Sequence, residues 1–332
     1  MNPGEGPDAR IISLLGDGGE RTLGDDIRQG MAQPLKEIPP KHFYDTAGAE
    51  LFDRICELPE YYPTRAERAI LDGQGAEIVA ATGLGELVEL GSGTAEKTMV
   101  LLEAAARAGT LERFVPVDVT EAMVRGCAER CAGELPGLEV IGVVGDFGRH
   151  LGEIPDPQDG VPRVVALLGG TIGNFRPAER RRLLSQMAGL LRPEGDFLLV
   201  GADLVKDPAT LVAAYDDAAG VTAQFNLNVL KVVNRELGAD FDLEAFEHVA
   251  LWDPDEEWIE MRLRATRPMT VRIAELGIEV PFEKGEEIRT EISAKFTDER
   301  LTDDLASAGL EPVQAFLEPD GLFTLSLARP AA

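Results

Sequence analysis

Short apolar runs alternate with helix-like patterns between about residues 77 and 201. Uninterrupted apolar runs bounded by turn residues are typical of strands buried on both faces of a parallel sheet. The predicted strands are residues 87–90, 114–119, 140–144, 164–168 and 197–201. Helical patterns lie between them, one ending near Ala108 and one over residues 178–191. Right-handed crossovers would join these strands into a doubly wound α/β sheet.

The rest of the chain does not keep this rhythm. Near the C-terminus, residues 313–317 and 322–327 predict a hairpin around the turn Pro319–Gly321. The two flanks of the alternating region mix aromatic, helical and strand-like patterns. We therefore predict one domain from residues 66–203 and 296–332, and a second domain from residues 12–65 and 204–295.

Composition excludes several classes of protein. With 332 residues, of which 44% are hydrophobic, the chain can bury a large core. Its 59 acidic and 32 basic residues give a net charge of −27, which repels nucleic acid and anionic lipid surfaces. No apolar stretch reaches the roughly 18 residues of a membrane span. We expect no nucleic-acid partner and no membrane partner.

The cysteines and histidines suggest no metal and a reducing compartment. Three cysteines are too few, and odd in number, for a disulfide framework, so we expect a cytoplasmic protein. Cys127 and Cys131 lie four residues apart on a predicted helix, but no histidine is near them in sequence. The three histidines, at positions 42, 150 and 248, show no metal spacing either. We therefore predict no metal site.

A glycine-rich loop, Glu89–Thr94, lies between a predicted strand and a helix, where backbone can approach a ligand closely. A phosphate-binding loop would fit Gly91–Thr98 except that Glu96 replaces a glycine, and a dinucleotide-binding fingerprint fails at the same position. S-adenosylmethionine (SAM) has no phosphate and a positive sulfonium, so an acidic strand residue such as Glu89 favours it. Methyl transfer is the preferred interpretation, with ATP, GTP and NAD as alternatives.

Acidic and aromatic residues follow the next predicted strands. Asp118 is placed to accept hydrogen bonds from both ribose hydroxyls of a bound cofactor. Asp146 and Phe147 can hold adenine by a hydrogen bond and by stacking. Lys97, in the first turn of the predicted helix, opposes the helix dipole and is either a ligand for the methionine carboxylate of SAM or a surface lysine.

Five motifs together resemble the histidine-specific Nα-methyltransferases of ergothioneine biosynthesis, which trimethylate histidine to hercynine. The resemblance runs nearly end to end, and its most specific segments are Lys41–Asp45, Leu58–Arg65, Glu89–Thr98, Gly169–Phe175 and Arg289–Ser293. The chain departs from the family at His42, where relatives have a larger aromatic residue. The resemblance implies an α/β fold with a doubly wound, Rossmann-like class I methyltransferase sheet, and a second, substrate-binding domain formed from the two flanking segments.

The resemblance also assigns residues to both ligands. It implies SAM contacts, with S-adenosylhomocysteine (SAH) as the product, at Tyr44, Gly91, Lys97, Asp118, Asp146 and Phe147. It implies contacts to the L-histidine substrate at Phe52, Tyr61, Gly169, Asn174, Tyr215, Met261, Glu291 and Ser293. In the family, residues matching Asn174, Tyr215 and Tyr61 hold the carboxylate and α-amine, and residues matching Glu291 and Ser293 hold the imidazole.

Elementary chemistry agrees with these assignments. A neutral imidazole offers one N–H donor and one acceptor, and Glu291 and Ser293, two apart on one strand face, supply an acceptor and a donor. The amine must lose a proton before methyl transfer, and Tyr61 and Asn174 are the predicted catalytic residues that accept it through water. Aromatic faces, including Tyr44 and Phe52, would stabilise the methylated cation by roughly 0.5–2 kcal/mol.

Two other functions stay open at this point. A methyltransferase of the same fold acting on another amino acid would share the SAM-binding residues and differ at Glu291 and Ser293. A regulator that binds ligand without catalysis could dispense with Tyr61 and Asn174, and both are present. Because a site built from two domains of one chain needs no second copy, we expect a monomer.

Overall fold

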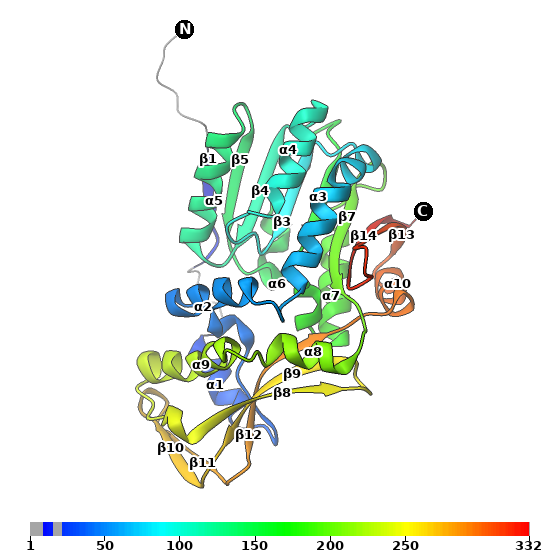
Figure 1. The fold of residues 1–332 in the computed structure, drawn as a ribbon. Coiled ribbons are helices and arrows are strands. Elements are labelled where there is room, and N and C mark those ends of the chain that lie inside the picture. The colour runs from blue at the N-terminus through cyan, green and yellow to red at the C-terminus, as the bar shows by residue number, and fades with distance from the viewer. Residues whose placement is uncertain (1–8, 16–21, 332) are drawn as a thin grey trace. The chain divides into compact units, whose positions relative to one another are not determined.

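The chain forms two compact units (Figure 1). The computed structural model describes residues 9–15 and 22–331. The first unit contains the N-terminal strand, Arg65–Leu204 and the C-terminal segment from Phe296. The second unit contains the segment that ends at Thr64 together with Val205–Lys295.

An eight-stranded sheet is the centre of the first unit as the structure describes it. Six neighbouring strands are parallel, and the C-terminal hairpin adds two antiparallel strands at one edge. In spatial order the strands are β1 (Ala9–Ser13), β5 (Glu139–Val144), β4 (Arg113–Asp118), β3 (Glu86–Leu90), β6 (Arg163–Leu167), β7 (Phe197–Asp203), β14 (Phe323–Pro330) and β13 (Leu310–Leu317). The five predicted parallel strands and the hairpin are confirmed.

Strand β1 was not predicted from the sequence. It pairs in parallel with β5, with Ile12 opposite Val143 and Ser13 opposite Val144. The sequence placed residues 12 and 13 in the second domain, whereas the structure places them at the edge of the large sheet. A five-residue edge strand has little periodicity, and only its pairing partner defines it. Residues 16–21 of the predicted range 12–65 lie outside the described residues.

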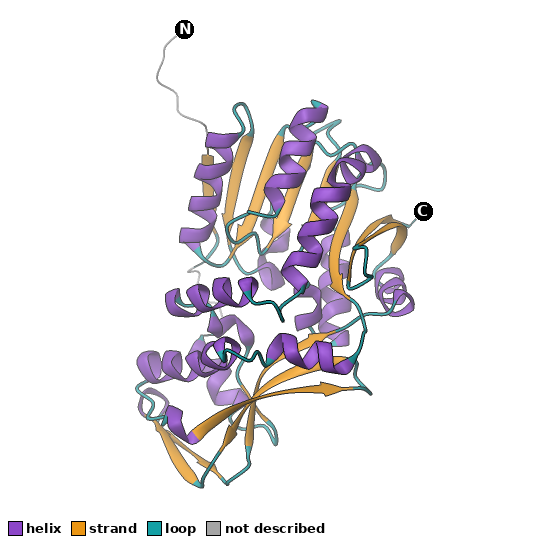
Figure 2. Cartoon of the chain, in the orientation of Figure 1, coloured by secondary structure: helices purple, strands orange, loops and turns teal. Residues whose placement is uncertain are grey.

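Helices cover the sheet of the first unit (Figure 2). The chain passes from β3 to β4 and β5 in one direction, and from β6 to β7 in the other. Right-handed crossovers therefore place their helices on opposite faces, and the order reverses between β3 and β6, where doubly wound sheets bind ligands. The helices are α3 (Pro63–Thr82), α4 (Thr98–Ala108), α5 (Glu121–Glu134), α6 (Phe147–His150), η2 (Leu151–Glu153), η3 (Thr171–Asn174), α7 (Pro177–Ala188) and α10 (Asp298–Ser307).

The second unit is built on a smaller, mixed sheet. Its strands, in spatial order, are β2 (Lys36–Glu37), β12 (Glu287–Ala294), β9 (Trp258–Ala265) and β8 (Phe246–Asp253), beside a separate pair, β10 (Met269–Ile273) and β11 (Ile278–Phe282). Its helices are α1 (Leu23–Gly30), η1 (Pro40–Phe43), α2 (Thr46–Glu57), α8 (Pro208–Tyr215), α9 (Val221–Leu237), η4 (Leu243–Ala245) and η5 (Ala274–Leu276). Among them, α2 and α9 pack against each other.

A β-bulge in β12 decides which side chains share a face. Arg289 pairs with Arg262 of β9, but Glu291 pairs with the adjacent residue Met261, so Thr290 is an extra residue. Beyond the bulge Ser293 pairs with Ile259, on the same face as Met261. Because a shift of one residue reverses the two faces of a strand, the bulge turns Glu291 and Ser293 to the face that Met261 shares.

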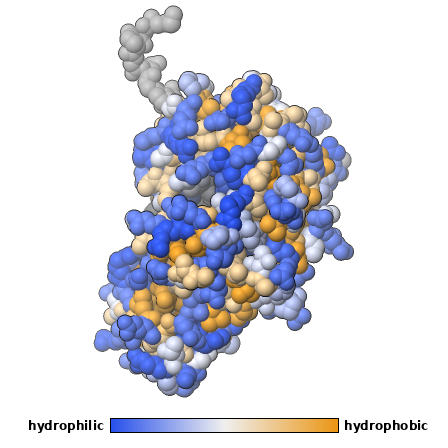
Figure 3. All heavy atoms as spheres, in the orientation of Figure 1, coloured by the Kyte–Doolittle hydropathy of each residue, from blue (hydrophilic) through white to orange (hydrophobic). Residues whose placement is uncertain are grey.

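The face shown in Figure 3 is largely hydrophilic, with hydrophobic residues in scattered areas. Of the helices that the structure describes, none combines the length and the apolar character needed to cross a membrane.

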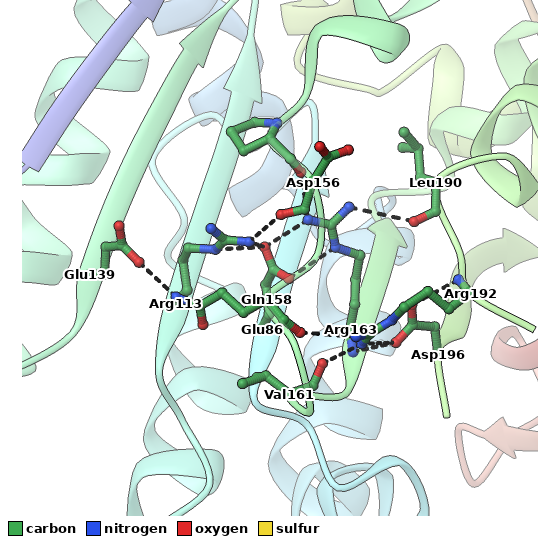
Figure 4. Close-up of polar contacts among 11 residues, drawn as sticks. Glu86, Arg113, Glu139, Asp156, Gln158, Val161, Arg163, Leu190, Arg192 and Asp196 are labelled. Atoms are coloured by element: carbon green, nitrogen blue, oxygen red, sulfur yellow. Dashed lines mark hydrogen bonds and ion pairs between the residues drawn. The ribbon is translucent and has the colours of Figure 1, made fainter. Parts of the chain in front are cut away.

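A buried ion cluster joins the amino ends of three central strands in the first unit (Figure 4). The Glu86 carboxylate, at the start of β3, accepts from Arg113 Nε at 2.7 Å and from Arg163 Nη2 at 2.8 Å. Asp196 accepts from the Arg163 backbone N–H at 2.8 Å. Removing one partner from such a buried cluster costs about 3–5 kcal/mol, because a charge is left uncompensated. This cluster stabilises the edge of the sheet opposite the glycine loop.

Candidate active site

The glycine loop after β3 exposes backbone at the carboxyl edge of the large sheet. Gly91 has a φ of +73°, a conformation that favours glycine. The N–H groups of Gly91 and Ser92 donate to the Val117 carbonyl of β4, at 2.8 and 3.3 Å. A Cβ on Gly91 would lie 3.8 Å from Cε1 of Phe147, so the Phe147 ring lies beside this loop. The structure thus brings two predicted SAM contacts together.

The two predicted acidic residues lie at the ends of the neighbouring strands. Asp118 accepts from the Gly93 N–H at 3.2 Å and from the Thr120 N–H at 2.9 Å, and both bonds hold its carboxylate at the loop. Asp146 precedes α6 and accepts from the Gly148 N–H at 2.8 Å. Each carboxylate is partly exposed and so keeps oxygen lone pairs for a ligand.

Lys97 is not an outward-pointing surface lysine. Its ammonium forms an ion pair with Glu67 of α3, a side chain that is fully buried. The other Glu67 oxygen accepts from the Gly169 N–H at 2.7 Å, and a Cβ on Gly169 would lie 3.5 Å from Lys97 Nζ. Glu67 therefore ties α3, the start of α4 and the end of β6 together. The sequence analysis missed it, because an acid between Arg65 and Arg68 is typical of a solvated helix face.

Glu89 is buried beneath the glycine loop. Thr98 Oγ1 donates to its Oε1 at 2.5 Å, while its Oε2 is buried without a hydrogen bond from any described residue. Burial raises the pKa of Glu89 to about 8, against the hydrogen bond from Thr98 and the charge of Lys97. A carboxyl group with this pKa is mostly protonated near pH 7, so Glu89 carries little negative charge when no ligand is bound.

The second unit contains a continuous cluster of aromatic rings, which we call the aromatic cluster. Ring centroids of neighbouring members lie 4.5–6.2 Å apart, and the members are Phe43, Tyr44, Phe52, Tyr61, Tyr215 and Phe225. A Cβ on Gly48 would lie 1.7 Å from the Phe43 carbonyl oxygen, so only glycine allows α2 to pack this closely on η1. The sequence analysis missed Phe225, which reads as an ordinary core residue of α9.

A polar group lies beside these rings. Tyr215 Oη and Ser293 Oγ are hydrogen-bonded at 2.7 Å. The ammonium of Lys295 donates to both oxygens, at 3.0 Å to Tyr215 and at 2.9 Å to Ser293, and lies 4.7 Å from the centre of the Tyr215 ring. Lys295 is fully buried, and the sequence analysis missed it. Its spacing from Glu291 and Ser293, two residues at each step on one strand face, could have indicated it.

Two titratable groups among the predicted substrate contacts have shifted pKa values. Burial raises the pKa of Glu291 to about 7, while the charge of Lys295 lowers it. Burial also raises the pKa of the Tyr61 phenol well above its usual value, and the neighbouring Tyr215 and Cys56 add to the shift. Tyr61 therefore stays a neutral phenol near pH 7, whereas Glu291 is poised between its two charge states.

Behind the polar group, a hydrogen-bond chain fixes the backbone that carries it. His248 Nε2 lies 2.8 Å from the Tyr215 carbonyl oxygen, and Asn226 Nδ2 lies 2.8 Å from His248 Nδ1. Thr290 Oγ1 donates to Asn226 Oδ1 at 2.6 Å. Burial lowers the pKa of His248, so the neutral ring donates from Nε2 and accepts at Nδ1. The chain links the bulge residue to the end of α8.

The predicted residues divide between the two units. Those in the first unit are Gly91, Lys97, Asp118, Asp146, Phe147, Gly169 and Asn174. Those in the second unit are Tyr44, Phe52, Tyr61, Tyr215, Met261, Glu291 and Ser293. Tyr44, a predicted SAM contact, thus belongs to the aromatic cluster, whereas Asn174 and Gly169, predicted substrate contacts, follow β6.

Comparison with known proteins identifies the family. A family model described as histidine-specific methyltransferase, SAM-dependent, matches residues 23–330. The chain belongs to this family. The family resemblance predicted from the five motifs is confirmed.

Individual relatives match over most of the chain. A protein of Mycolicibacterium smegmatis named histidine N-alpha-methyltransferase is 53% identical over 315 residues, which are 95% of this chain and 97% of the relative. A protein of the same name from Mycobacterium tuberculosis is 51% identical, over 96% of this chain and 98% of the relative. Ergothioneine biosynthesis protein 1 of Neurospora crassa is 28% identical over 84% of this chain, which matches 31% of that longer protein.

Proposed function

We propose that this protein is an L-histidine Nα-methyltransferase that uses SAM to trimethylate the α-amino group, giving hercynine for ergothioneine biosynthesis. The names of the relatives support the substrate and the pathway. The observation that carries the proposal is the bulge in β12, which directs Glu291 and Ser293 to the face shared with Met261. An acceptor and a donor, two residues apart on one strand face, suit an imidazole.

The residues at the carboxyl edge of the large sheet suit SAM. Gly91 and Phe147 would hold its adenosine against the loop, Asp118 the ribose hydroxyls and Asp146 the adenine, with Lys97 at the methionine carboxylate. When bound, SAM supplies an electrophilic methyl group on a positive sulfur. Burial raises the pKa of Glu89 to about 8, and a positive sulfur beside it would favour its ionised form. No metal is part of this proposal.

In the second unit, Glu291 would accept the imidazole N–H and Ser293 would donate to the other ring nitrogen. Met261 and Phe52 would line the ring, with Tyr61 and Tyr215 toward the α-amine and carboxylate. The roles of Tyr44 toward SAM, and of Asn174 and Gly169 toward histidine, stay predictions. Correct orientation of the amine is the largest catalytic contribution that these residues can make.

Tyr61 would take part in deprotonating the amine as a neutral hydrogen-bond acceptor. Because its pKa is raised, Tyr61 is not ionised near pH 7 and cannot take the proton as a phenolate. The proton of the α-amino group would instead leave through a water molecule that Tyr61 orients. The rings of Tyr44, Phe52 and Tyr61 would stabilise the methylated ammonium by roughly 0.5–2 kcal/mol. That attraction favours retention of partly methylated histidine for the next transfer.

We also propose that the protein acts as a monomer in the cytoplasm. All three cysteines, Cys56, Cys127 and Cys131, are free thiols, which suits a reducing compartment.

Turnover tests the proposed function directly. Purified protein is incubated with SAM and L-histidine, and mono-, di- and trimethylated histidine are followed by mass spectrometry. We expect the trimethylated product to accumulate with SAH. Binding of both ligands without methylation would contradict the proposal and favour the regulator considered from the sequence.

A further inference from the structure

Lys295 is a buried cation that has no place in the function described so far. It follows β12 directly, and its Nζ lies 2.9 Å from Ser293 Oγ and 3.0 Å from Tyr215 Oη. A lysine ammonium has three donors and no acceptor. Both hydroxyl oxygens therefore accept from Lys295, which restricts what each can offer to a ligand.

The hydrogen bond between the two hydroxyls restricts them further. Tyr215 Oη and Ser293 Oγ lie 2.7 Å apart, so one of their two protons is shared between them. A phenol is a stronger acid than an aliphatic alcohol, so Tyr215 is the favoured donor and Ser293 the acceptor. Ser293 Oγ then accepts from both Tyr215 and Lys295, which occupies both its lone pairs. Its own proton is left, and Ser293 can only donate to a ligand.

We propose that Lys295 is a positioning residue that holds Ser293 as an obligate hydrogen-bond donor and so makes the site specific for a ring with an accepting nitrogen. The inference rests on the proposed function, because it concerns the residues assigned to the imidazole. Glu291, on the same strand face, accepts from the other ring nitrogen. Together the pair selects the neutral imidazole in one orientation, with its N–H toward Glu291.

Lys295 also acts on Glu291 through its charge. The groups that face Glu291 among the described residues are Lys295 on its own strand segment, Tyr61 before α3 and the uncharged Met261 on β9. Of these, Lys295 is the cation that favours the carboxylate form. Its removal raises the pH above which Glu291 is ionised and accepts a charge-assisted hydrogen bond from the imidazole.

The test is calorimetric titration of histidine into wild type, Lys295→Met, Ser293→Ala and the double variant, from below to above pH 7. We expect Lys295→Met and Ser293→Ala each to weaken histidine binding roughly ten-fold or more. At high pH, where Glu291 is ionised in all four proteins, the double variant should be little weaker than either single variant, because both changes remove one interaction. The pH midpoint of binding should move upward in Lys295→Met and not in Ser293→Ala.

Two results would overturn the proposal. One is a Lys295→Met variant that binds histidine as tightly as wild type at every pH. The other is a double variant whose loss of histidine affinity equals the product of the losses in the two single variants. SAH titration reports on the folded first unit, and Lys295→Gln replaces Lys295→Met if the latter fails to fold. Failure of the wild type to bind or methylate histidine would instead refute the proposed function itself.

Discussion

At the scale of single residues, the site depends on titratable groups kept away from water. Burial raises the pKa of Glu89 to about 8 and that of Glu291 to about 7, both far above the ordinary range of a carboxyl group. Such pKa shifts are typical of functional sites. Burying a carboxyl group costs free energy, and a fold retains that cost where the group serves a ligand. Each shift leads to a measurable dependence on pH.

Replacement of Glu291 should weaken binding of histidine and leave binding of SAH unchanged. Glu291→Gln loses a charge-assisted hydrogen bond of about 1.5–3 kcal/mol, so histidine should bind roughly ten- to a hundred-fold more weakly. In the wild type, affinity should fall as the pH drops through about 7, because the protonated carboxyl accepts only a weaker, uncharged hydrogen bond from the imidazole N–H. In the variant, histidine affinity should depend on pH only through the protonation of histidine itself.

Titration calorimetry checks this prediction. Glu279→Gln is the matched control, since Glu279 is an exposed acid on β11. Equal histidine affinity in Glu291→Gln and Glu279→Gln would remove Glu291 from the site.

Replacement of Glu89 should change the dependence of stability on pH. A carboxyl whose pKa is raised by folding destabilises the protein as the pH rises from the unfolded value of about 4.5 to the folded value of about 8. The slope is at most about 1.4 kcal/mol per pH unit. Glu89→Gln, which can still accept from Thr98, should lose this slope and be the more stable protein at high pH.

Thermal unfolding of the ligand-free protein at several pH values measures this effect. The comparison with wild type isolates Glu89, because all other carboxyl groups are common to both proteins. A constant difference in melting temperature across the pH range would show that Glu89 is ionised in the folded protein.

Replacement of Asp118 should weaken binding of the cofactor alone. Asp118→Ala removes the acceptor proposed for the ribose hydroxyls, and SAH should bind about ten-fold or more weakly. Asp303→Ala, at an exposed position on α10, is the control. Fluorescence or calorimetric titration with SAH measures both, and wild-type affinity in Asp118→Ala would exclude the ribose contact.

At the scale of elements, the bulge in β12 determines on which face of the strand Glu291 lies. In a regular strand, Glu291 would share a face with Arg289, which forms ion pairs with Glu37 and Glu260. The extra residue Thr290 turns Glu291 to the other face, opposite Met261. The alternation of side chains along the sequence of β12 could not predict the face on which Glu291 lies. A bulge is defined by the pairing of the strand with its partner, which the sequence of one strand does not show.

The bulge should therefore be sensitive to its own hydrogen bonds. Thr290 Oγ1 lies 2.6 Å from Asn226 Oδ1 and 3.0 Å from the Met261 carbonyl oxygen. Thr290→Val keeps the shape and leaves those acceptors unpaired, which should cost about 1–3 kcal/mol of stability and weaken histidine binding. Thr290→Ser keeps the hydroxyl and should restore most of both. Equal behaviour of the two variants in denaturation and titration would contradict this role.

The sequence predicts the central sheet well and the second unit only in outline. Strands β3–β7 are short apolar runs with turn signals at both ends, and each was predicted to within two residues. Glu67 and Lys295 were missed, because a single charged residue reads as solvent-exposed until its burial and its partners are known. Local patterns identify elements, whereas these two residues depend on contacts across more than seventy positions of the chain.

At the scale of the whole molecule, each unit is discontinuous in sequence. The chain leaves the first unit after Leu204, builds most of the second, and returns at Phe296 to finish the large sheet. The predicted ligand contacts follow this division, with the acidic and glycine residues predicted for SAM in one unit and the aromatic cluster with its polar group in the other. The resemblance to the family assigned both sets to one reaction, which spacing along the sequence could not.

Glu291 and Ser293 should restrict methylation to histidine among the standard amino acids. The most direct test is mass spectrometry after incubation of the purified protein with SAM and an equimolar mixture of the twenty standard amino acids. We expect histidine alone to be converted, and its product to be the trimethylated form. Methylation of a different amino acid, with histidine unchanged, would contradict the roles of Glu291 and Ser293 while leaving the SAM-binding residues in place.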